Sequence, residues 1–322
     1  MRPIIRARDL GYQHATRATA AFQGVNLDIA SGERVLITGD SGSGKSTLLS
    51  VIAGLAADDE DGQSAGTCEV RGTVGMVMQD PEAQTILSRV GDDVAFGAEN
   101  MGVPPNEIWP RVEDALDAVG LDVALDHKTA RLSGGQKQRL ALAGVIAMGA
   151  DVIILDEPTA NLDPAGRDEV IAAVDQVCRR TSAALIVVEH RPAHWAQVIE
   201  TFYRLTPAGL ISIAATELPE APKLPPALEV AVGTEPAVAA HNVQTRFGPP
   251  RTLSVPQGFS TVLTGKNGSG KTTLAHVLAG LVAPESGQVV YSDAVAQGLR
   301  TPAHTWTCLL YTSDAADEED SV

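Results

Sequence analysis

Short apolar runs alternate with longer stretches of helical spacing along the N-terminal part of the chain. Residues 34–38 (RVLIT), 73–78 (TVGMVM), 152–155 (VIIL) and 184–188 (ALIVV) are brief and nearly continuous apolar runs. Such runs are typical of strands covered on both faces, whereas residues 46–53 carry the apolar spacing of a helix. The alternation predicts an α/β domain with a mostly parallel sheet in which these strands lie side by side.

Two further local signals complete this domain. Asp163 followed by Pro164 is typical of an N-cap with proline at the first helical position, so we expect a helix from there to about Arg180. Residues 202–213 (FYRLTPAGLISI) are interrupted at Pro207–Gly209, which predicts a closing hairpin.

The chain contains an internal repeat. Residues 39–55 (GDSGSGKSTLLSVIAGL) and 265–281 (GKNGSGKTTLAHVLAGL) are identical at 11 of 17 positions, at an offset of 226. Proline removes amide donors and favours extended backbone, so the segment 216–240 between the repeats is expected to be a linker. Its prolines are Pro219, Pro222, Pro225, Pro226 and Pro236.

Length and composition agree with two folded domains and exclude several classes of protein. A chain of 322 residues with 44% hydrophobic and 20% charged residues is globular. The net charge of -16 disfavours nucleic acid as a partner, and no apolar stretch reaches the roughly 20 residues of a membrane-spanning helix. Cys68, Cys178 and Cys308 form no CxxC pair, which suggests a reducing compartment.

The first repeat carries a phosphate-binding pattern. Its GxxxxGK[ST] motif follows a predicted strand and opens a predicted helix, as such a loop requires. Glycines let backbone N–H groups point at phosphate oxygens, Lys45 would neutralise the β and γ phosphates, and the Ser46 hydroxyl would bind Mg²⁺. The residues assigned to this nucleotide site are Gly39, Gly42, Ser43, Gly44, Lys45, Ser46 and Thr47.

Asp156 and Glu157 follow the apolar run 152–155. They therefore lie at the carboxyl end of a strand, where open α/β sheets bind ligands. Asp156 would hold Mg²⁺ through water, and Glu157 would polarise the water that attacks the γ-phosphate. Alone, such a pair is more often a solvated turn, but a preceding phosphate loop favours catalysis.

A second anion site is expected at Ser133, Gly134, Gly135 and Gln136, which precede an amphipathic run. A serine hydroxyl and glycine amides at a helix N-terminus attract anions. An ordinary helix cap is the alternative.

With LSGGQ at 132–136 in place, residues 1–215 resemble the ATP-binding-cassette (ABC) ATPases. The resemblance implies ATP and Mg²⁺ as ligands, and a P-loop fold with an antiparallel β subdomain and a helical subdomain. It also implies that Gln79 contacts Mg²⁺ and the transport partner, and that His190 contacts the γ-phosphate. By the same resemblance, Asn161, Leu162 and Asp163 form the D-loop, and Tyr12 stacks on adenine.

A narrower resemblance concerns residues 79–84 (QDPEAQ) and 92–100 (DDVAFGAEN), which look like the corresponding tract of energy-coupling-factor (ECF) transporter ATPases. It implies an ATPase that energises uptake of a vitamin or transition-metal ion, bound peripherally at the cytoplasmic face to integral membrane subunits through the surface near Gln79. The alternatives are another ABC importer branch, a soluble tandem ABC protein acting on ribosomes or DNA, and a silent nucleotide-binding module.

The second repeat implies the same phosphate chemistry. By resemblance its site comprises Gly265, Gly268, Ser269, Gly270, Lys271, Thr272 and Thr273, with Thr272 on Mg²⁺ and Phe247 in place of Tyr12. The sequence contains no second signature, acidic strand end or switch histidine, and residues 241–307 are expected to lack the strands that bury a phosphate-loop core.

We therefore expect a complete domain at 1–215, the linker at 216–240, and the beginning of a second domain at 241–307. Residues 308–322 resemble translated adapter read-through, so the natural sequence is expected to be longer and this tail an artefact. Neither nucleotide site is complete if the two halves of the chain face each other, and hydrolysis is expected to need another complete ABC domain.

Overall fold

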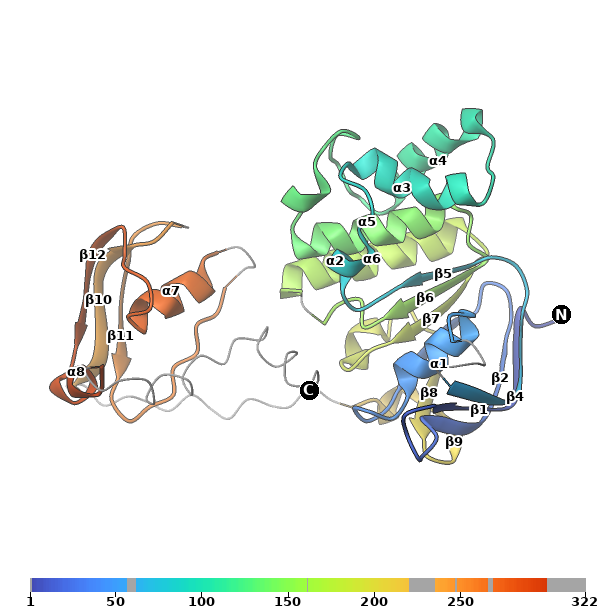
Figure 1. The fold of residues 1–322 in the computed structure, drawn as a ribbon, viewed down its shortest axis with the longest axis horizontal. Helices are drawn as coiled ribbons and strands as arrows, with labels where there is room; N and C mark the ends of the chain where they lie inside the picture. Colours follow the sequence, from blue (N-terminus) through green and yellow to red (C-terminus); the bar gives the residue numbers. More distant parts are fainter. Residues whose placement is uncertain are drawn as a thin grey trace. The chain divides into compact units, whose positions relative to one another are not determined.

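The computed structural model describes residues 2–56, 62–160, 162–219, 235–246, 248–265 and 269–299. The chain divides into two compact units, Met1–Pro222 and Lys223–Val322 (Figure 1).

A six-stranded sheet of order β5-β6-β7-β3-β8-β9 forms the centre of the first unit. All of its neighbouring strands pair in parallel except β8 and β9, which form the predicted closing hairpin. The strands are β3 (Arg34–Thr38), β5 (Val74–Val77), β6 (Val152–Asp156), β7 (Ala184–Val188), β8 (Thr201–Thr206) and β9 (Gly209–Ile213). The predicted parallel sheet is confirmed.

Apolar side chains fill both faces of this sheet because successive residues of a strand point to opposite sides. In β3, Leu36 belongs to the hydrophobic cluster on one face, and Val35 and Ile37 belong to the cluster on the other. The continuous apolar runs of the sequence therefore reflect strands that are buried on both sides.

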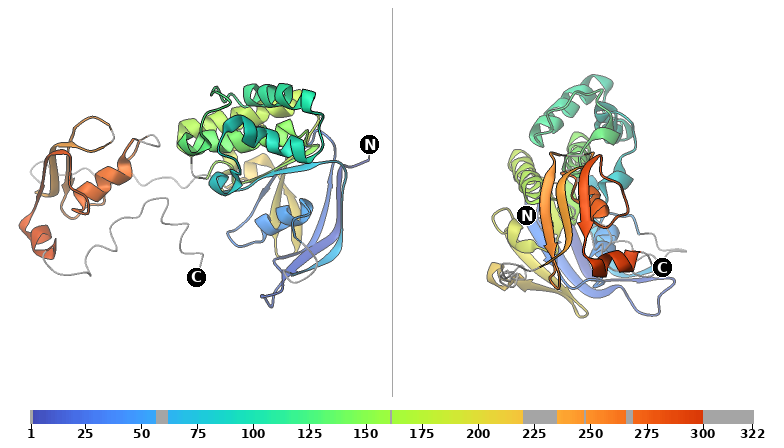
Figure 2. Two further views of the ribbon diagram at one scale, coloured as in Figure 1. Left: turned by 45° about the horizontal axis from the view of Figure 1, so that its top comes forward. Right: turned by 90° about the vertical axis from the view of Figure 1, so that its left-hand side faces the viewer.

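Helices cover one face of the sheet as a thick layer, and a single helix lies on the other (Figures 1 and 2). The layer contains α3 (Val90–Asn100), α4 (Pro105–Ala118), α5 (Gly134–Ala147) and α6 (Pro164–Arg180), with the short α2 (Pro81–Gln84) beside it. The opposite face carries α1 (Lys45–Ile52). Short 3₁₀ turns are η1 (Thr129–Arg131), η2 (Pro192–Trp195) and η3 (Ala215–Glu217).

A three-stranded antiparallel sheet of order β2-β1-β4 shares its core with α1. Its strands are β1 (Ile5–His14), β2 (Phe22–Ile29) and β4 (Gly62–Val70). The antiparallel and helical subdomains that the family resemblance implies are thus both present.

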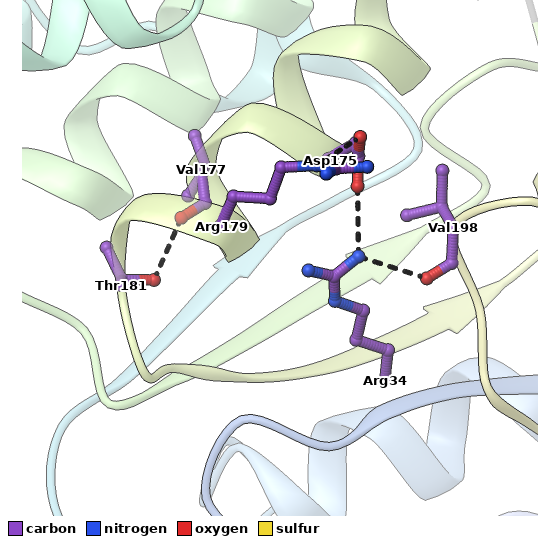
Figure 3. A network of polar contacts seen from close by, with 6 residues as sticks. All are labelled: Arg34, Asp175, Val177, Arg179, Thr181 and Val198. Carbon is purple, nitrogen blue, oxygen red and sulfur yellow. Dashed lines mark hydrogen bonds and ion pairs between the residues drawn. The ribbon is translucent and has the colours of Figure 1, made fainter.

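An ionic network fixes the beginning of β3, the strand that leads into the phosphate loop (Figure 3). The Arg34 guanidinium donates to the Asp175 carboxylate at 2.9 Å and to the Val198 carbonyl at 3.3 Å. The other Asp175 oxygen accepts a hydrogen bond from Arg179 at 2.8 Å. Because Arg34 and Asp175 are largely buried, this pair ties the central strand to α6 more firmly than an exposed ion pair would.

The second unit repeats the antiparallel part of the first. Its sheet has the order β11-β10-β12, in which the first strand of the unit again pairs with both others. The elements are β10 (Pro236–Gln244), β11 (Arg251–Pro256), α7 (Lys271–Leu278), β12 (Ser286–Tyr291) and α8 (Asp293–Leu299). They bury a small cluster of Ala240, Val243, Leu274, Val277 and Leu278.

Two expectations about this region need correction. β10 begins at Pro236, a position where proline is tolerated in a strand, so the expected linker 216–240 extends into folded structure. The three strands also bury a local core that we did not expect. The strand that leads into the phosphate loop of the first unit has no equivalent among the described residues of the second. Residues 261–264, which correspond to β3, form no strand, and Val262 is 81% exposed, whereas its counterpart Leu36 is 0% exposed.

Candidate active site

Several sequence-predicted site residues of the first unit follow strands that end at one edge of the parallel sheet. Parallel strands present their carboxyl ends at the same edge, and β3, β5, β6 and β7 are all parallel (Figure 1). β3 runs into the phosphate loop, and Gln79 follows β5 at an exposed bend. Asp156 ends β6, and His190 follows β7 after one intervening residue.

The phosphate loop depends on glycine at its junction with α1. Gly44 is the N-cap of α1 with a φ of 89°, a left-handed conformation that residues with a side chain rarely adopt. A Cβ at this position would lie 2.3 Å from the carbonyl oxygen of Ala21. Only glycine fits here, and the N-terminal amides of α1 stay open to an anion.

Lys45 folds back over the loop. Its ammonium donates to the carbonyl oxygens of Gly39 at 3.0 Å and Asp40 at 2.8 Å, and the residue is 6% exposed. Burial lowers the pKa of Lys45, and the negative charges of Glu157 and Asp156 oppose that fall. The cation therefore lies within the field of the acidic pair that ends β6.

Asp156 supplies an unused oxygen to the site. Its Oδ1 is buried and has no hydrogen-bond partner among the described residues, while the residue itself is 7% exposed. Burial raises the pKa of Asp156, and a hydrogen bond from Ser46 and the charge of Lys45 oppose that rise. A carboxylate and a hydroxyl close together are the hard oxygen donors that Mg²⁺ prefers, so these residues fit such an ion.

This donor set is not a metal cage of protein ligands alone. Within the described ranges, no group of three or more His, Cys, Asp or Glu side chains could hold a metal ion. Mg²⁺ in nucleotide sites typically takes one or two protein ligands and completes its shell with phosphate and water.

Glu157 is held in an unusual backbone conformation. Its φ is 48°, in the left-handed region, and its N–H donates to the Val188 carbonyl at 2.9 Å. Its Oε1 lies 2.7 Å from Nε2 of His190. Burial raises the pKa of Glu157, and the neighbouring His190 opposes that rise.

The signature residues form a capping box. The Ser133 hydroxyl accepts from the Gln136 N–H at 3.3 Å, and the Gln136 side chain accepts from the Ser133 N–H at 2.9 Å. Ser133 and Gly134 are exposed, and Gly134 and Gly135 lie beside Leu162 near the start of α6. Both the expected anion site and the ordinary cap are compatible with this geometry.

Asp163, the other residue implied for the nucleotide site in this region, is the N-cap of α6. Its Oδ1 accepts a hydrogen bond from the Gly166 N–H at 2.8 Å. The predicted helix with proline at its first turn is confirmed.

Sequence analysis missed the contacts that shape the tract after Gln79. The Gln84 side chain accepts from the Met78 N–H at 2.7 Å and donates to the Met76 carbonyl at 3.0 Å. Glu82 forms an ion pair with Lys137 of α5, the helix that Ser133 caps. These contacts connect the tract with the signature helix.

The structure does not support the expected role of Tyr12. Its ring is 3% exposed within the core, edge-on to His14 with centroids 5.1 Å apart. A base needs an open ring face for stacking, and the buried ring of Tyr12 offers none. The aromatic ring at the phosphate loop is instead His14, whose Nε2 lies 3.2 Å from the Thr47 hydroxyl.

The second loop has partly equivalent geometry. Gly270 is the left-handed N-cap of α7, and Lys271 donates to the Gly265 carbonyl at 2.9 Å. The Ser269 carbonyl accepts from Arg251 at 2.7 Å, and Thr272 and Thr273 lie in the first turn of α7.

The expectations for Asn161, Phe247 and Gly268, for most of the linker and for residues 308–322 fall outside the described residues.

Comparisons with known proteins agree with this geometry. The sequence model of the ABC transporter family matches residues 22–160 and 250–310. The energy-coupling factor transporter ATP-binding protein EcfA1 of Lacticaseibacillus paracasei is 42% identical over 195 residues, which cover 58% of this chain and 70% of that protein. A putative ABC transporter ATP-binding protein of Methanosarcina mazei is 37% identical over 201 residues, but the match spans only 35% of its length.

Solved structures show the same fold. The chain matches cbiO1 from Clostridium perfringens, described as part of an ABC transporter complex, with a TM-score of 0.57 and 32% identity, covering 66% of this chain and 88% of cbiO1. It also matches an ATP-binding cassette dimer bound to ADP and Pi, with a TM-score of 0.55 and 25% identity, covering 64% of this chain and 96% of that one. None of the helices in the described residues has the length and apolar character to cross a membrane.

Proposed function

The chain belongs to the ABC transporter family and is an ATP-hydrolysing enzyme, and from that premise we propose that it energises an importer of the ECF type for a vitamin or transition-metal ion. The observation that carries the proposal is the tract 79–100, anchored by Gln84 and by Asp93. The 42% identity to an energy-coupling factor transporter ATPase supports it.

ATP binding begins at the first loop. The backbone N–H groups at the start of α1 bind the phosphates, with Gly42 and Gly44 keeping the loop open. Lys45 exchanges its two carbonyl partners for phosphate oxygens, which offer a full negative charge where the carbonyls offer only a dipole. His14 lies next to Thr47 and would offer its ring to the nucleotide base in place of Tyr12.

Ser46 and Asp156 would hold Mg²⁺, with Gln79 as a further oxygen donor. When bound, the ion neutralises charge that develops on the phosphate oxygens. Among the described residues, Asp156 Oδ1 has no hydrogen-bond partner, which leaves it available for this purpose.

Glu157 takes the role of the group that orients and deprotonates the attacking water. A carboxylate with a raised pKa is a better base, because its pKa is closer to the working pH. His190 contacts this carboxylate, and from there it would reach the γ-phosphate once ATP is bound. Catalysis then consists mainly of positioning and charge neutralisation.

The surface near Gln79 is the proposed docking site for integral membrane subunits. Two apolar side chains near Gln79 are strongly exposed, Met78 at 41% and Ile86 at 59%. Asp93 accepts hydrogen bonds from the Ile86 and Leu87 N–H groups at 2.8 and 2.7 Å, so the backbone beneath this patch is fixed. With a net charge of -16, attachment through anionic lipid is unfavourable, and a protein partner is expected.

Binding to membrane vesicles tests this docking site. Vesicles from the source cells, stripped of peripheral proteins, should float with the wild-type chain, and Ile86→Glu should weaken that binding. Ile211→Glu is the matched control, because Ile211 is 47% exposed on β9, away from the tract. Equal binding to protein-free phosphatidylglycerol vesicles, or equal loss with both variants, would refute the proposal.

A further inference from the structure

Glu189 is a buried carboxylate that the catalytic scheme above does not use. It lies between the end of β7 and His190 and is 3% exposed. The His190 imidazole pairs with Glu157, so it does not neutralise Glu189. Burying a carboxylate costs free energy unless its oxygens are hydrogen-bonded, so we expect both oxygens of Glu189 to have partners.

Each carboxylate oxygen of Glu189 accepts one hydrogen bond from the active-site edge. Oε2 accepts from the Thr159 hydroxyl at 2.6 Å, and Oε1 accepts from the backbone N–H of His190 at 2.9 Å. Thr159 is itself buried, at 7% exposure. The two bonds therefore join the turn after β6 to the segment after β7 inside the protein.

These bonds close a ring around the catalytic pair. Thr159 lies two residues after Glu157, and Glu189 immediately precedes His190. The His190 ring then returns to Glu157 at 2.7 Å, and the Glu157 N–H bonds to Val188 at 2.9 Å. A displacement of either segment would break one of the Glu189 hydrogen bonds and leave an oxygen of this buried carboxylate without its partner.

We propose that Glu189 is a positioning residue for ATP hydrolysis, which holds His190 against Glu157 through its bonds to Thr159 and to the His190 backbone. The inference rests on the roles proposed for Glu157 and His190 but not on the transport partner. Glu189 itself touches neither the phosphate loop nor the expected Mg²⁺ ligands through any hydrogen bond found among the described residues.

Steady-state hydrolysis by Glu189→Ala and Glu189→Gln tests the proposal. We expect Glu189→Ala to lower kcat at least about tenfold, with KM for ATP changed by less than about threefold, because misplacement affects the reacting groups and not the phosphate loop. Glu189→Gln should recover most of this loss, since its amide oxygen accepts from the His190 N–H and its amide N–H donates to the Thr159 hydroxyl. Glu113→Ala, at an exposed position of α4, is the control.

A double-mutant cycle with His190→Ala separates positioning from general stability. If Glu189 acts through His190, Glu189→Ala should lower kcat no further in the His190→Ala background. Multiplicative losses, a KM-only effect, or wild-type kcat in folded Glu189→Ala would overturn the proposal. Should Glu189→Ala fail to fold, Thr159→Val against Thr159→Ser tests the same bond. If His190→Ala alone keeps wild-type kcat, the proposed role of His190 is what fails.

Discussion

His190 Nε2 lies 2.7 Å from Glu157 Oε1, so the side chain that follows β7 meets the carboxylate that follows β6. The two strands are neighbours in the sheet, with Asp156 paired to Val188. Residues that are 33 positions apart in the sequence thereby share one edge of the sheet. This pair, next to Lys45 of the neighbouring strand's loop, is the centre of the proposed catalytic site.

Replacing Glu157 by Gln should lower ATP turnover at least about a hundredfold, because the amide keeps the shape of the side chain but cannot accept a proton from water. ATP affinity should change little, since Lys45 and the loop amides remain. Phosphate release and equilibrium nucleotide binding measure the two effects separately. Glu113→Gln, at an exposed position, serves as the control. Turnover close to that of the wild type would exclude Glu157 as the base.

The raised pKa of Glu157 predicts the acid side of the pH profile and a stability effect. Hydrolysis should fall as pH drops through this pKa, which lies above the ordinary value of 4.5. Between the unfolded and folded pKa values the native state binds more protons, so stability decreases as pH rises through that window. Without nucleotide, Glu157→Gln should therefore melt at a higher temperature than wild type at neutral pH, and this difference should vanish below about pH 4. A lower melting temperature at neutral pH would contradict the burial argument.

Lys45→Ala should weaken ATP binding itself, because the loop loses the cation that pairs with the phosphates. A loss of at least about tenfold in affinity corresponds to one charge-assisted hydrogen bond, and calorimetric titration with ATP measures it. Lys128→Ala removes an exposed lysine elsewhere and should leave affinity unchanged. Equal affinities of Lys45→Ala and wild type would remove Lys45 from the nucleotide site.

Some of this site could be predicted from the sequence, and some could not. Local patterns identified the phosphate loop, Asp163 as a helix cap, and the strands over 152–155 and 184–188. The burial of Tyr12 could not be predicted, because a strand pattern does not tell which of two rings near its end packs into the core; the structure buries Tyr12 and places His14 beside Thr47. Glu189 gave no signal, since its bond to Thr159 exists only once β6 and β7 pair.

The repeated loop shows the same limit. Residues 35–38 and 261–264 precede equivalent glycine loops, but only the first segment is a strand. β3 is paired with β7 and β8, whereas the described part of the second unit offers residues 261–264 no strand partner. A short apolar run therefore specifies a strand only together with its neighbours.

Gly44→Ala should abolish nucleotide binding and destabilise the first unit. The new Cβ would lie 2.3 Å from the Ala21 carbonyl oxygen at a φ of 89°, so the loop must move. Gly144→Ala is a contrasting control in the middle of α5, where a Cβ meets no atom within 4 Å. That change should stabilise the protein by about 1 kcal/mol, the helix-propensity difference between the two residues. Denaturant unfolding and ATP titration of both variants measure these effects. Wild-type stability and ATP affinity of Gly44→Ala would contradict the prediction.

Hydrolysis should require pairing of two first units, because the signature does not serve the loop of its own unit. Ser133 is exposed, and its cap bonds run to Gln136 rather than to Lys45 or Ser46. In a head-to-tail pair, each site combines the loop of one copy with Ser133 of the other, so turnover per molecule should rise with protein concentration. A mixing experiment sharpens this expectation. Lys45→Ala and Ser133→Arg should each be inactive alone, and random pairing of equal amounts should restore about a quarter of the wild-type sites. Concentration-independent turnover by a demonstrated monomer, or mixed dimers without any recovered activity, would show that the site is not shared between copies.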